Sequence, residues 1–328
     1  MLPQALDKAL SSFGSLRSKV DEALVKDQLR RVKWMWLVYT PSASRRLRVA
    51  GIDSGYNFIE YRGYALYVVD AACVSIDSLE GGEEVFGDAD TDVISSSFIE
   101  SELAAYSIAM EIELARRALD SADLVVVDGS LVAKFATLAR AAESGFEIER
   151  LKGISFRRVL DELIYLVGLY PSKIVFLAKN TSSKDVLGLV KGDVYYFDRY
   201  TAEVGFSKPV ALEDCSSIGS RALGSRMRGE IKRLVGSSAS VYVTYARLRD
   251  GARVYRLELV VEDGESPRER VKRVVEALSA VEVQGYPYPL LRADQLARVS
   301  ERDVERVATV LGISRDPVAR EILWAGYP

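Results

Sequence analysis

The sequence predicts an α/β fold in which a mixed sheet is flanked by helices. Short apolar runs of strand length recur along the chain, and most of them are bounded by Gly, Asp, Ser or Asn. Segments with apolar residues at helical spacing stand between these runs. Neither an internal repeat nor a low-complexity linker divides the 328 residues. One elaborated domain is therefore expected rather than two.

The helices are predicted from apolar residues that recur every three to four positions. The first of them is amphipathic, and it suits docking on the core or a dimer contact. Pro171 ends the segment that begins at Ser155. The predicted helices cover residues 1–30, 97–120, 131–142, 155–169, 267–281 and a closing region within 301–328.

The strands are predicted from short runs rich in Val, Ile, Leu and Tyr. Asp250-Gly251 is a strong hairpin signal, and turns are expected at Tyr56-Asn57 and Arg62-Gly63. The acidic, Gly-containing stretch 80–92 reads as an exposed loop. The predicted strands cover residues 47–54, 64–76, 124–128, 174–178, 194–197, 241–248 and 253–261.

This order of elements divides the chain into three segments. Residues 1–44 form an amino-terminal helical extension, residues 45–300 hold the sheet and its helices, and residues 301–328 form a carboxyl-terminal helical segment. The expected strands near both ends of the central segment feed one sheet, so these segments describe a single elaborated domain.

The composition excludes several kinds of chemistry. The chain contains no histidine, which rules out His-based triads, His zinc sites and imidazole acid–base catalysis. Its two cysteines lie far apart in the sequence and form no metal-binding pattern. The net charge of −3 gives no global attraction to nucleic acid. Neither a signal peptide nor a membrane-spanning run is recognisable, so a cytoplasmic protein is expected.

Two acidic residues stand where apolar runs end. Asp53 lies between Gly51 and Gly55, and Asp128 closes the run Leu124–Val127 before a glycine. Taken singly, Asp53 suits a turn and Asp128 suits a helix cap. As a pair at the ends of two buried strands they favour a cation site, because a buried carboxylate is costly unless it is paired or bound to metal.

Further carboxylates can be added from helix faces. Glu111 lies within the apolar stripe of its helix, whereas Glu113 has basic partners at helical spacing and reads as a solvated residue. Asp294 lies on a predicted helix near the carboxyl end, where a surface pair with Arg298 is equally compatible with the spacing. Oxygen ligands of this kind suit Mn²⁺ or Mg²⁺, and two such ions can hydrolyse a phosphodiester.

Several basic and aromatic residues are candidates for contacts with a substrate. Lys179 follows a buried strand and could contact a phosphate, or it could be a surface lysine. Tyr286, between Gly285 and Pro287, could orient a phosphate or cap the core. The basic run 221–233 suits DNA phosphates or a solvated helix face. Its candidate DNA-binding residues are Arg221, Arg226 and Arg228.

These residues, taken in order, resemble the archaeal NurA nucleases. The resemblance spans about residues 45–300 and rests on an ordered set of motifs, none of which is specific alone. The motifs are Gly51-Ile52-Asp53-Ser54-Gly55, the helix with Glu111, Val127-Asp128-Gly129-Ser130, Phe176-Leu177-Ala178-Lys179, and Tyr286-Pro287-Tyr288-Pro289-Leu290 through Ala293-Asp294.

The resemblance implies an RNase H-like fold and a manganese-dependent nuclease. It implies digestion of DNA from 5′ to 3′ and cleavage of single strands, during end resection in double-strand-break repair. It also implies a homodimer that docks on a HerA-type hexameric ATPase. By position, Asp53, Glu111 and Asp128 would bind two Mn²⁺ or Mg²⁺ ions, with Lys179 and Tyr286 in support. Asp294 stands where the family often has His, and an Asp there would make the metal site more acidic.

Two other functions remain open at this point. A Gly-Ile-Asp-x-Gly run also opens the phosphate loop of actin-like and sugar-kinase ATPases, but the second, paired-glycine Asp loop of those proteins is missing, as is a Walker motif. A non-catalytic DNA-binding adaptor would use the acids only as turns and caps. The joint presence of Asp53, Glu111 and Asp128 argues against that adaptor.

Overall fold

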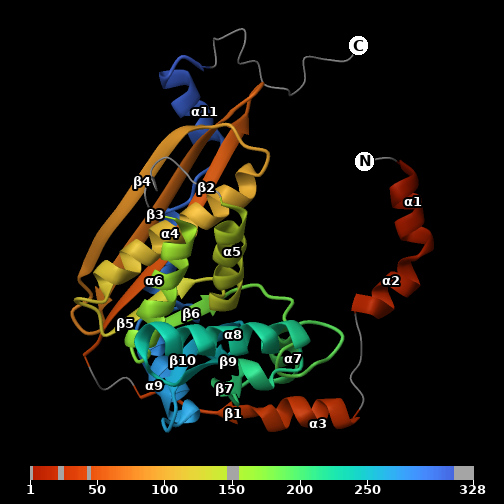
Figure 1. The fold of residues 1–328 in the computed structure, drawn as a ribbon. Coiled ribbons are helices and arrows are strands. Elements are labelled where there is room, and N and C mark those ends of the chain that lie inside the picture. Colours follow the sequence, from red (N-terminus) through yellow and green to blue (C-terminus); the bar gives the residue numbers. More distant parts are fainter. Residues whose placement is uncertain (1–2, 21–25, 43–45, 146–154, 314–328) are drawn as a thin grey trace.

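A ten-stranded mixed sheet forms the centre of the protein (Figure 1). The computed structural model describes residues 3–20, 26–42, 46–145 and 155–313. The strands run in the spatial order β1-β7-β9-β10-β6-β5-β2-β3-β4, and β8 pairs with β9 beside this path. The sheet confirms the predicted α/β class.

Five consecutive strands make the part of the sheet that carries the candidate site. They are β2 (Arg48–Glu60), β3 (Ala65–Asp77), β4 (Glu83–Ile94), β5 (Leu124–Asp128) and β6 (Ile174–Ala178). The first three form an antiparallel meander, and β5 and β6 are added parallel to β2. Numbered within this group, the spatial order is 3-2-1-4-5, the arrangement of an RNase H-like fold.

The sheet continues beyond β6 through a second antiparallel part. The hairpin of β9 (Ala239–Arg247) and β10 (Tyr255–Glu262) pairs with β6 through β10. Its turn lies at Asp250-Gly251, as predicted. Three short strands finish this edge. They are β7 (Gly205–Ser207), β8 (Val210–Ala211) and β1 (Trp36–Val38).

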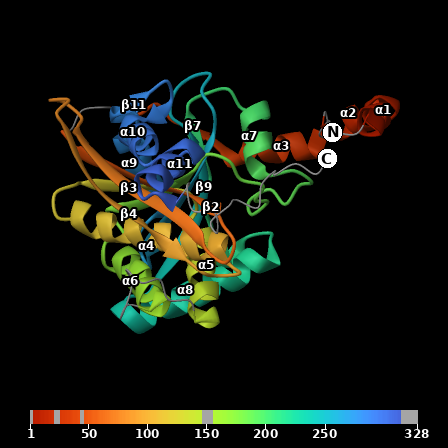
Figure 2. The same cartoon turned by 90° about the horizontal axis from the view of Figure 1, so that it is seen from above.

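Helices cover both faces of the sheet, as the view from above shows (Figure 2). One face, here called the α4 face, turns Ala50, Ile52, Val125 and Val127 toward its helices. Those helices are α4 (Ile99–Ala118), α5 (Leu131–Ser144), α6 (Phe156–Leu169), α7 (Asp193–Tyr200) and α8 (Ile218–Val235).

The opposite face, here called the α10 face, buries Val49, Leu124 and Val126. It is covered by α9 (Pro267–Ala280) and α10 (Tyr288–Leu296), with the small ribbon of β11 (Glu282–Val283) and β12 (Tyr286–Pro287) between them. A separate apolar cluster joins α11 (Glu301–Val310) to the far ends of β2 and β3.

The amino-terminal extension is helical but not one continuous helix. It contains α1 (Pro3–Ser11), α2 (Phe13–Val20) and α3 (Lys26–Met35). In Figure 1, α1 and α2 lie apart from the sheet, and α1 has no buried residue. Of the predicted closing segment 301–328, residues 314–328 lie outside the described residues. The division at residues 44 and 300 stays a prediction.

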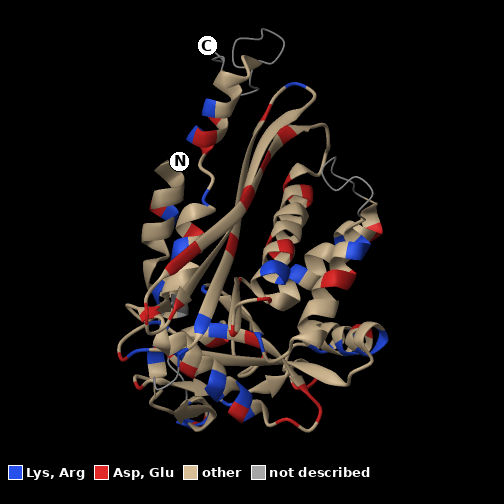
Figure 3. Cartoon of the chain, turned by 90° about the vertical axis from the view of Figure 1, so that its left-hand side faces the viewer, with Lys and Arg blue, Asp and Glu red and all other residues tan. Residues whose placement is uncertain are grey.

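Three local predictions are wrong. Residues 80–92 are largely strand β4 rather than a loop, because backbone pairing with β3 holds an edge strand whose side chains are mostly exposed. Figure 3 shows acidic segments repeated along these long strands. Residues 194–197 belong to helix α7, whose aromatic residues Tyr196 and Phe197 pack into the core. Tyr56-Asn57 lies inside β2, and the chain turns only at Arg62-Gly63.

Both cysteines are buried in the core on the α4 face. Burial raises the pKa of the Cys73 and Cys215 thiols to about 12. In the part of the chain that the structure describes, no helix has the length and apolar character that a membrane crossing requires.

Candidate active site

Three neighbouring strands, β2, β5 and β6, bring polar side chains to one place on the α10 face. β5 pairs with β2 up to Ile52↔Val127 and with β6 up to Asp128↔Leu177. Side chains alternate between the faces of a strand, so Asp53 and Asp128 project on the side where Val49 and Val126 lie. Lys179 follows Ala178, the last residue of β6. The predicted strand ends are right for Asp128 and Lys179 and wrong for Asp53, because β2 continues to Glu60 and Asp53 lies inside it. Strand pairing nevertheless makes the three residues neighbours.

The two glycines around Asp53 let α10 pack directly on β2. A Cβ atom at Gly51 would lie 2.3 Å from the backbone nitrogen of Leu290, and one at Gly55 would lie 2.3 Å from the carbonyl oxygen of Ala297. Both glycines share the face of Asp53 because they lie two positions before and after it. The Gly-x-Asp-x-Gly pattern therefore reflects close contact with a helix, not a turn.

Glu111 reaches the site from α4, on the other face of the sheet. Its side chain is buried, with 3% of its surface exposed, as its place in the apolar stripe predicts. Ser54 Oγ donates a hydrogen bond to Glu111 Oε1 at 2.6 Å, and the Lys134 ammonium pairs with Oε2. Lys134 comes from the second turn of α5, the helix that follows Asp128.

The three carboxylates are close enough to perturb one another. Burial, together with the charges of Asp128 and Glu111, raises the pKa of Asp53 from 3.8 to about 8. Burial also raises the pKa of Glu111, although Lys134 and Ser54 oppose this shift. Clustered carboxyl groups whose pKa values are raised by desolvation and by like charge are typical of functional sites.

Lys179 joins the remaining candidates. Its Nζ lies 2.7 Å from Asp294 Oδ1 and 3.3 Å from Asp128 Oδ1. The hydroxyl of Tyr286 donates to the same oxygen of Asp128 at 3.3 Å, and Lys179 Nζ lies 5.2 Å from the centre of the Tyr286 ring. Burial raises the pKa of Tyr286 above its ordinary value, as do the charges of Asp128 and Asp53. All six candidate residues thus belong to one cluster.

The donor chemistry of this cluster fits a hard divalent cation. Asp53, Glu111, Asp128 and Asp294 supply only carboxylate oxygens, the ligand type that Mn²⁺ and Mg²⁺ prefer. In the described residues, however, no three His, Cys, Asp or Glu side chains are arranged as a group that could hold a metal ion. Glu111, Asp128 and Asp294 each direct one oxygen at a lysine instead.

A sequence model described as the NurA domain matches residues 47–299. The chain belongs to the NurA family. Similar proteins include the NurA nuclease of Sulfolobus acidocaldarius, 24% identical over 345 aligned positions that cover 96% of this chain and 98% of the relative. The probable NurA nuclease of Methanocaldococcus jannaschii is 21% identical and is matched over 85% of its length and 90% of this chain.

Solved NurA structures share the fold. The crystal structure of the NurA nuclease from Sulfolobus solfataricus superposes with a TM-score of 0.74 at 22% identity, covering 95% of this chain and 97% of that one. A NurA structure described as bound to dAMP and manganese gives a TM-score of 0.59 at 11% identity, over 96% of this chain and 98% of that one. Similarity at these identities establishes the fold of this NurA chain and not its ligands.

Two contacts of this NurA site were not predicted from the sequence. Ser54 was part of a recognised motif, but nothing in the sequence indicated its bond to Glu111. Lys134 lies six residues after Asp128, and helical spacing alone does not show that it turns toward α4. A basic residue in the second turn after a strand-terminal Asp is the one signal that could have pointed to it.

The candidate DNA-binding arginines lie on α8, away from the carboxylates. Arg221 donates to the backbone oxygens of Cys215 and Ser216. Arg228 pairs with Asp263 at 2.6 Å, whereas Arg226 has a long contact of 3.8 Å to Glu143. Contact of Arg221, Arg226 and Arg228 with DNA therefore stays a prediction for this NurA chain.

Proposed function

We propose that this chain is a Mn²⁺-dependent deoxyribonuclease that hydrolyses phosphodiester bonds in DNA. The observation that carries the proposal is the meeting of Asp53, Glu111 and Asp128 from two strands and a helix, where burial and neighbouring carboxylates raise the pKa values of Asp53 and Glu111. Such a cluster of carboxylates is costly without a cation to neutralise it. The names of the relatives as nucleases support the choice of reaction.

The residues of the cluster divide into two roles in this proposal. Asp53, Glu111, Asp128 and Asp294 would hold two Mn²⁺ ions, with Mg²⁺ as the substitute. Glu111 and Asp128 would exchange one lysine contact each for an ion. When bound, the metal supplies an activated water and stabilises charge on the departing oxygen.

Lys179 and Tyr286 act on the substrate side. The positively charged Lys179 ammonium lies beside Asp128 Oδ1. A scissile phosphate bound next to this oxygen would be attracted to the ammonium group. The Tyr286 hydroxyl remains a proton donor because its pKa is raised, so it fixes the orientation of Asp128. The chain offers no imidazole for proton transfer.

The finer activity is proposed from the resemblance to NurA nucleases. The enzyme would degrade DNA from 5′ to 3′ and cut single strands, during end resection in double-strand-break repair. It would act as a homodimer with a HerA-type hexameric ATPase. The names of several relatives as DNA double-strand break repair nucleases support the role in double-strand-break repair. Such a substrate would place the protein in the cytoplasm.

The deciding experiment is a cleavage assay with end-labelled single- and double-stranded DNA in Mn²⁺, Mg²⁺ or EDTA. Asp53→Ala and Asp128→Ala should abolish Mn²⁺-dependent cleavage while the circular dichroism spectrum stays that of the wild type. Glu111→Gln should behave likewise, and its matched control Glu113→Gln on the exposed side of the same helix should be fully active. Labels at the 5′ and 3′ ends separate the two polarities.

Other outcomes of this assay would replace the proposal. Wild-type cleavage by Asp53→Ala or Asp128→Ala would eliminate the carboxylate site. DNA binding without cleavage in any metal would favour the adaptor. ATP binding seen by calorimetry would favour an actin-like or sugar-kinase ATPase.

A further inference from the structure

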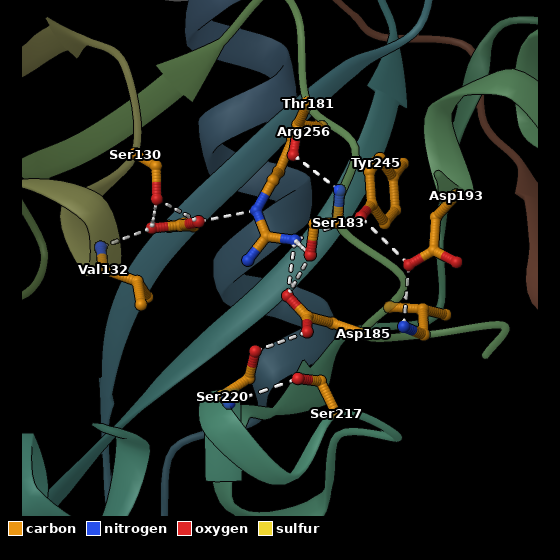
Figure 4. A network of polar contacts seen from close by, with 12 residues as sticks. Ser130, Val132, Thr181, Ser183, Asp185, Asp193, Ser217, Ser220, Tyr245 and Arg256 are labelled. Atoms are coloured by element: carbon orange, nitrogen blue, oxygen red, sulfur yellow. Dashed lines mark hydrogen bonds and ion pairs between the residues drawn. The ribbon is translucent and has the colours of Figure 1, made fainter. Parts of the chain in front are cut away.

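A buried ion cluster lies on the α4 face, beneath the strand ends that carry the candidate site. Its centre is Arg256 of β10, 3% exposed, with Glu258 two residues further along the same strand, 1% exposed. Leu257 and Leu259 alternate with them and pack on the α10 face, which places both charged residues on the α4 face. Figure 4 shows Arg256 surrounded by polar partners from several segments.

Glu258 holds the first turn of α5. Its carboxylate accepts hydrogen bonds from Ser130 Oγ at 2.9 and 3.0 Å and from the backbone nitrogen of Val132 at 3.0 Å. Ser130 is the N-cap of α5 and follows Asp128 by two residues. An anion at a helix N-terminus satisfies free N–H groups and is favoured by the helix dipole. Glu258 therefore fixes the turn that begins with Asp128.

Arg256 holds the segment that follows Lys179. Arg256 lies opposite Ala178 in the pairing of β10 with β6, one residue before Lys179. Its guanidinium pairs with Asp185 at 2.7 Å and donates to Ser183 Oγ at 2.7 Å. Asp185 also accepts from Ser220 Oγ of α8 at 2.6 Å. The contacts with Ser183 and Asp185 thus anchor the segment after Lys179 to Arg256.

One contact joins the two halves of the cluster. Arg256 Nε donates to Glu258 Oε1 at 2.5 Å. Glu258, which contacts the turn after Asp128, is therefore hydrogen-bonded to Arg256, which contacts the segment after Lys179. Burying one guanidinium with two carboxylates is weak evidence for stability, because apolar side chains of similar size often do as well. The cluster contacts both the turn after Asp128 and the segment after Lys179. This position indicates a role other than stability.

We propose that Glu258 and Arg256 are positioning residues of the nuclease site, which set Asp128 and Lys179 relative to one another from the opposite face of the sheet. The inference rests on the proposed function. Glu258 acts through Ser130 and Val132, and Arg256 acts through Ser183 and Asp185. Neither residue touches the substrate. Loss of groups that orient metal-binding residues in this way typically lowers metal affinity or activity.

The primary test is Glu258→Gln, which keeps the size of the side chain and removes its charge. The variant should lower kcat and weaken Mn²⁺ binding by about ten- to a hundredfold, while KM for DNA stays at the wild-type value. Mn²⁺ binding is measured by calorimetry with the metal alone. In metal-free protein, amide hydrogen exchange of a peptide covering residues 128–134 should become faster.

Arg270→Met is the matched control for loss of a buried charge. Arg270 is 2% exposed and donates to the carbonyl oxygen of Pro171, which precedes β6 and so lies at the other end of that strand. This variant should lose thermal stability yet keep wild-type kcat, Mn²⁺ affinity and exchange over residues 128–134. An equal loss of kcat in Arg270→Met and Glu258→Gln would overturn the proposal, as would wild-type kcat and Mn²⁺ affinity in folded Glu258→Gln.

A milder pair of variants decides the matter if Glu258→Gln does not fold. Ser130→Ala removes the hydroxyl that contacts both carboxylate oxygens of Glu258 and accepts from the backbone nitrogen of Ala133, whereas Ser130→Thr keeps it. Weaker Mn²⁺ binding in Ser130→Ala with recovery in Ser130→Thr supports the proposal, whereas identical behaviour of Ser130→Ala and the wild type overturns it. Failure of the proposed function is separate, because it would appear as an inactive wild-type protein.

Discussion

The ammonium group of Lys179 lies 2.7 Å from a carboxylate oxygen of Asp294. The pairing explains how a lysine remains charged within the site. Burial acts to lower the pKa of Lys179, but the hydrogen bond that Lys179 donates to Asp294 and the charge of Asp128 outweigh it and raise the pKa overall.

Replacing Asp294 should therefore lower the pKa of Lys179. In Asp294→Ala the strongest of the contributions that raise this pKa is lost, so Lys179 should lose its proton at lower pH than in the wild type. The pKa is measured by NMR of the methylated lysine, and the alkaline limb of the cleavage profile should move to lower pH with it. Asp120→Ala, on an exposed residue away from the site, serves as control. An unchanged Lys179 titration would contradict the prediction.

Asp53 should make the metal-free protein less stable as the pH rises. The unfolded chain releases this proton near the ordinary value of 3.8, whereas the folded protein holds it up to about 8. Between these values the folded state binds more protons, so the free energy of unfolding falls with pH, by at most about 1.4 kcal/mol per pH unit from this group.

Asp53→Asn removes this dependence. Urea unfolding in EDTA at pH 5 and pH 8 should show a smaller loss of stability in Asp53→Asn than in the wild type, with the variant more stable at pH 8. The same loss in both proteins would mean that Asp53 titrates normally.

A methyl group at Gly51 should push α10 away from β2. The added Cβ would lie 2.3 Å from the backbone of Leu290, and overpacking of this kind costs about 1–3 kcal/mol. Gly51→Ala should lower the melting temperature and reduce cleavage, since α10 carries Asp294. Gly82→Ala, at an exposed glycine with nothing within 4 Å of the added Cβ, should change neither property. Equal melting temperatures for the two variants would refute this account of the motif.

Lys134 should stabilise the metal-free protein by neutralising Glu111. The side chains of this pair are 11% and 4% exposed, and removing one partner of a buried pair costs about 3–5 kcal/mol. Lys134→Met should be destabilised by this order, and Glu111→Gln/Lys134→Met should recover much of the loss. Mn²⁺ should raise the melting temperature of Lys134→Met more than that of the wild type. Additive effects in the double variant would show that the pair does not interact.

The sequence predicts the central strands of the fold well because their signal is local. β5 and β6 occupy the predicted residues 124–128 and 174–178, where a short apolar run ends at polar residues. β4 gave no such signal, since its acidic side chains face solvent and its backbone bonds to β3 hold it in place. In α7, Tyr196 and Phe197 favour a strand by local propensity, but the segment forms a helix that buries both side chains in the core.

The candidate site was predictable as a set of residues and not as a set of contacts. Three of its residues stand beside the end of an apolar run, namely Asp53, Asp128 and Lys179, and Glu111 lies in an apolar stripe. Residue type and sequence position are therefore enough to select them as candidates. Arg256 and Glu258 alternate with Tyr255, Leu257 and Leu259, a pattern that predicts a strand with one solvated face. Their burial depends on α5 and α8 covering that face, which no local pattern reveals.

The two deeply buried cysteines make the chain convenient for distance measurements. Their thiols, with pKa values raised to about 12, are poor targets for maleimide reagents, because the thiolate is the reactive form. Cysteines introduced at the exposed residues Arg140 of α5 and Gln295 of α10 would then take spin labels selectively. Such a pair spans the sheet and would record whether its two helical layers move when DNA is added.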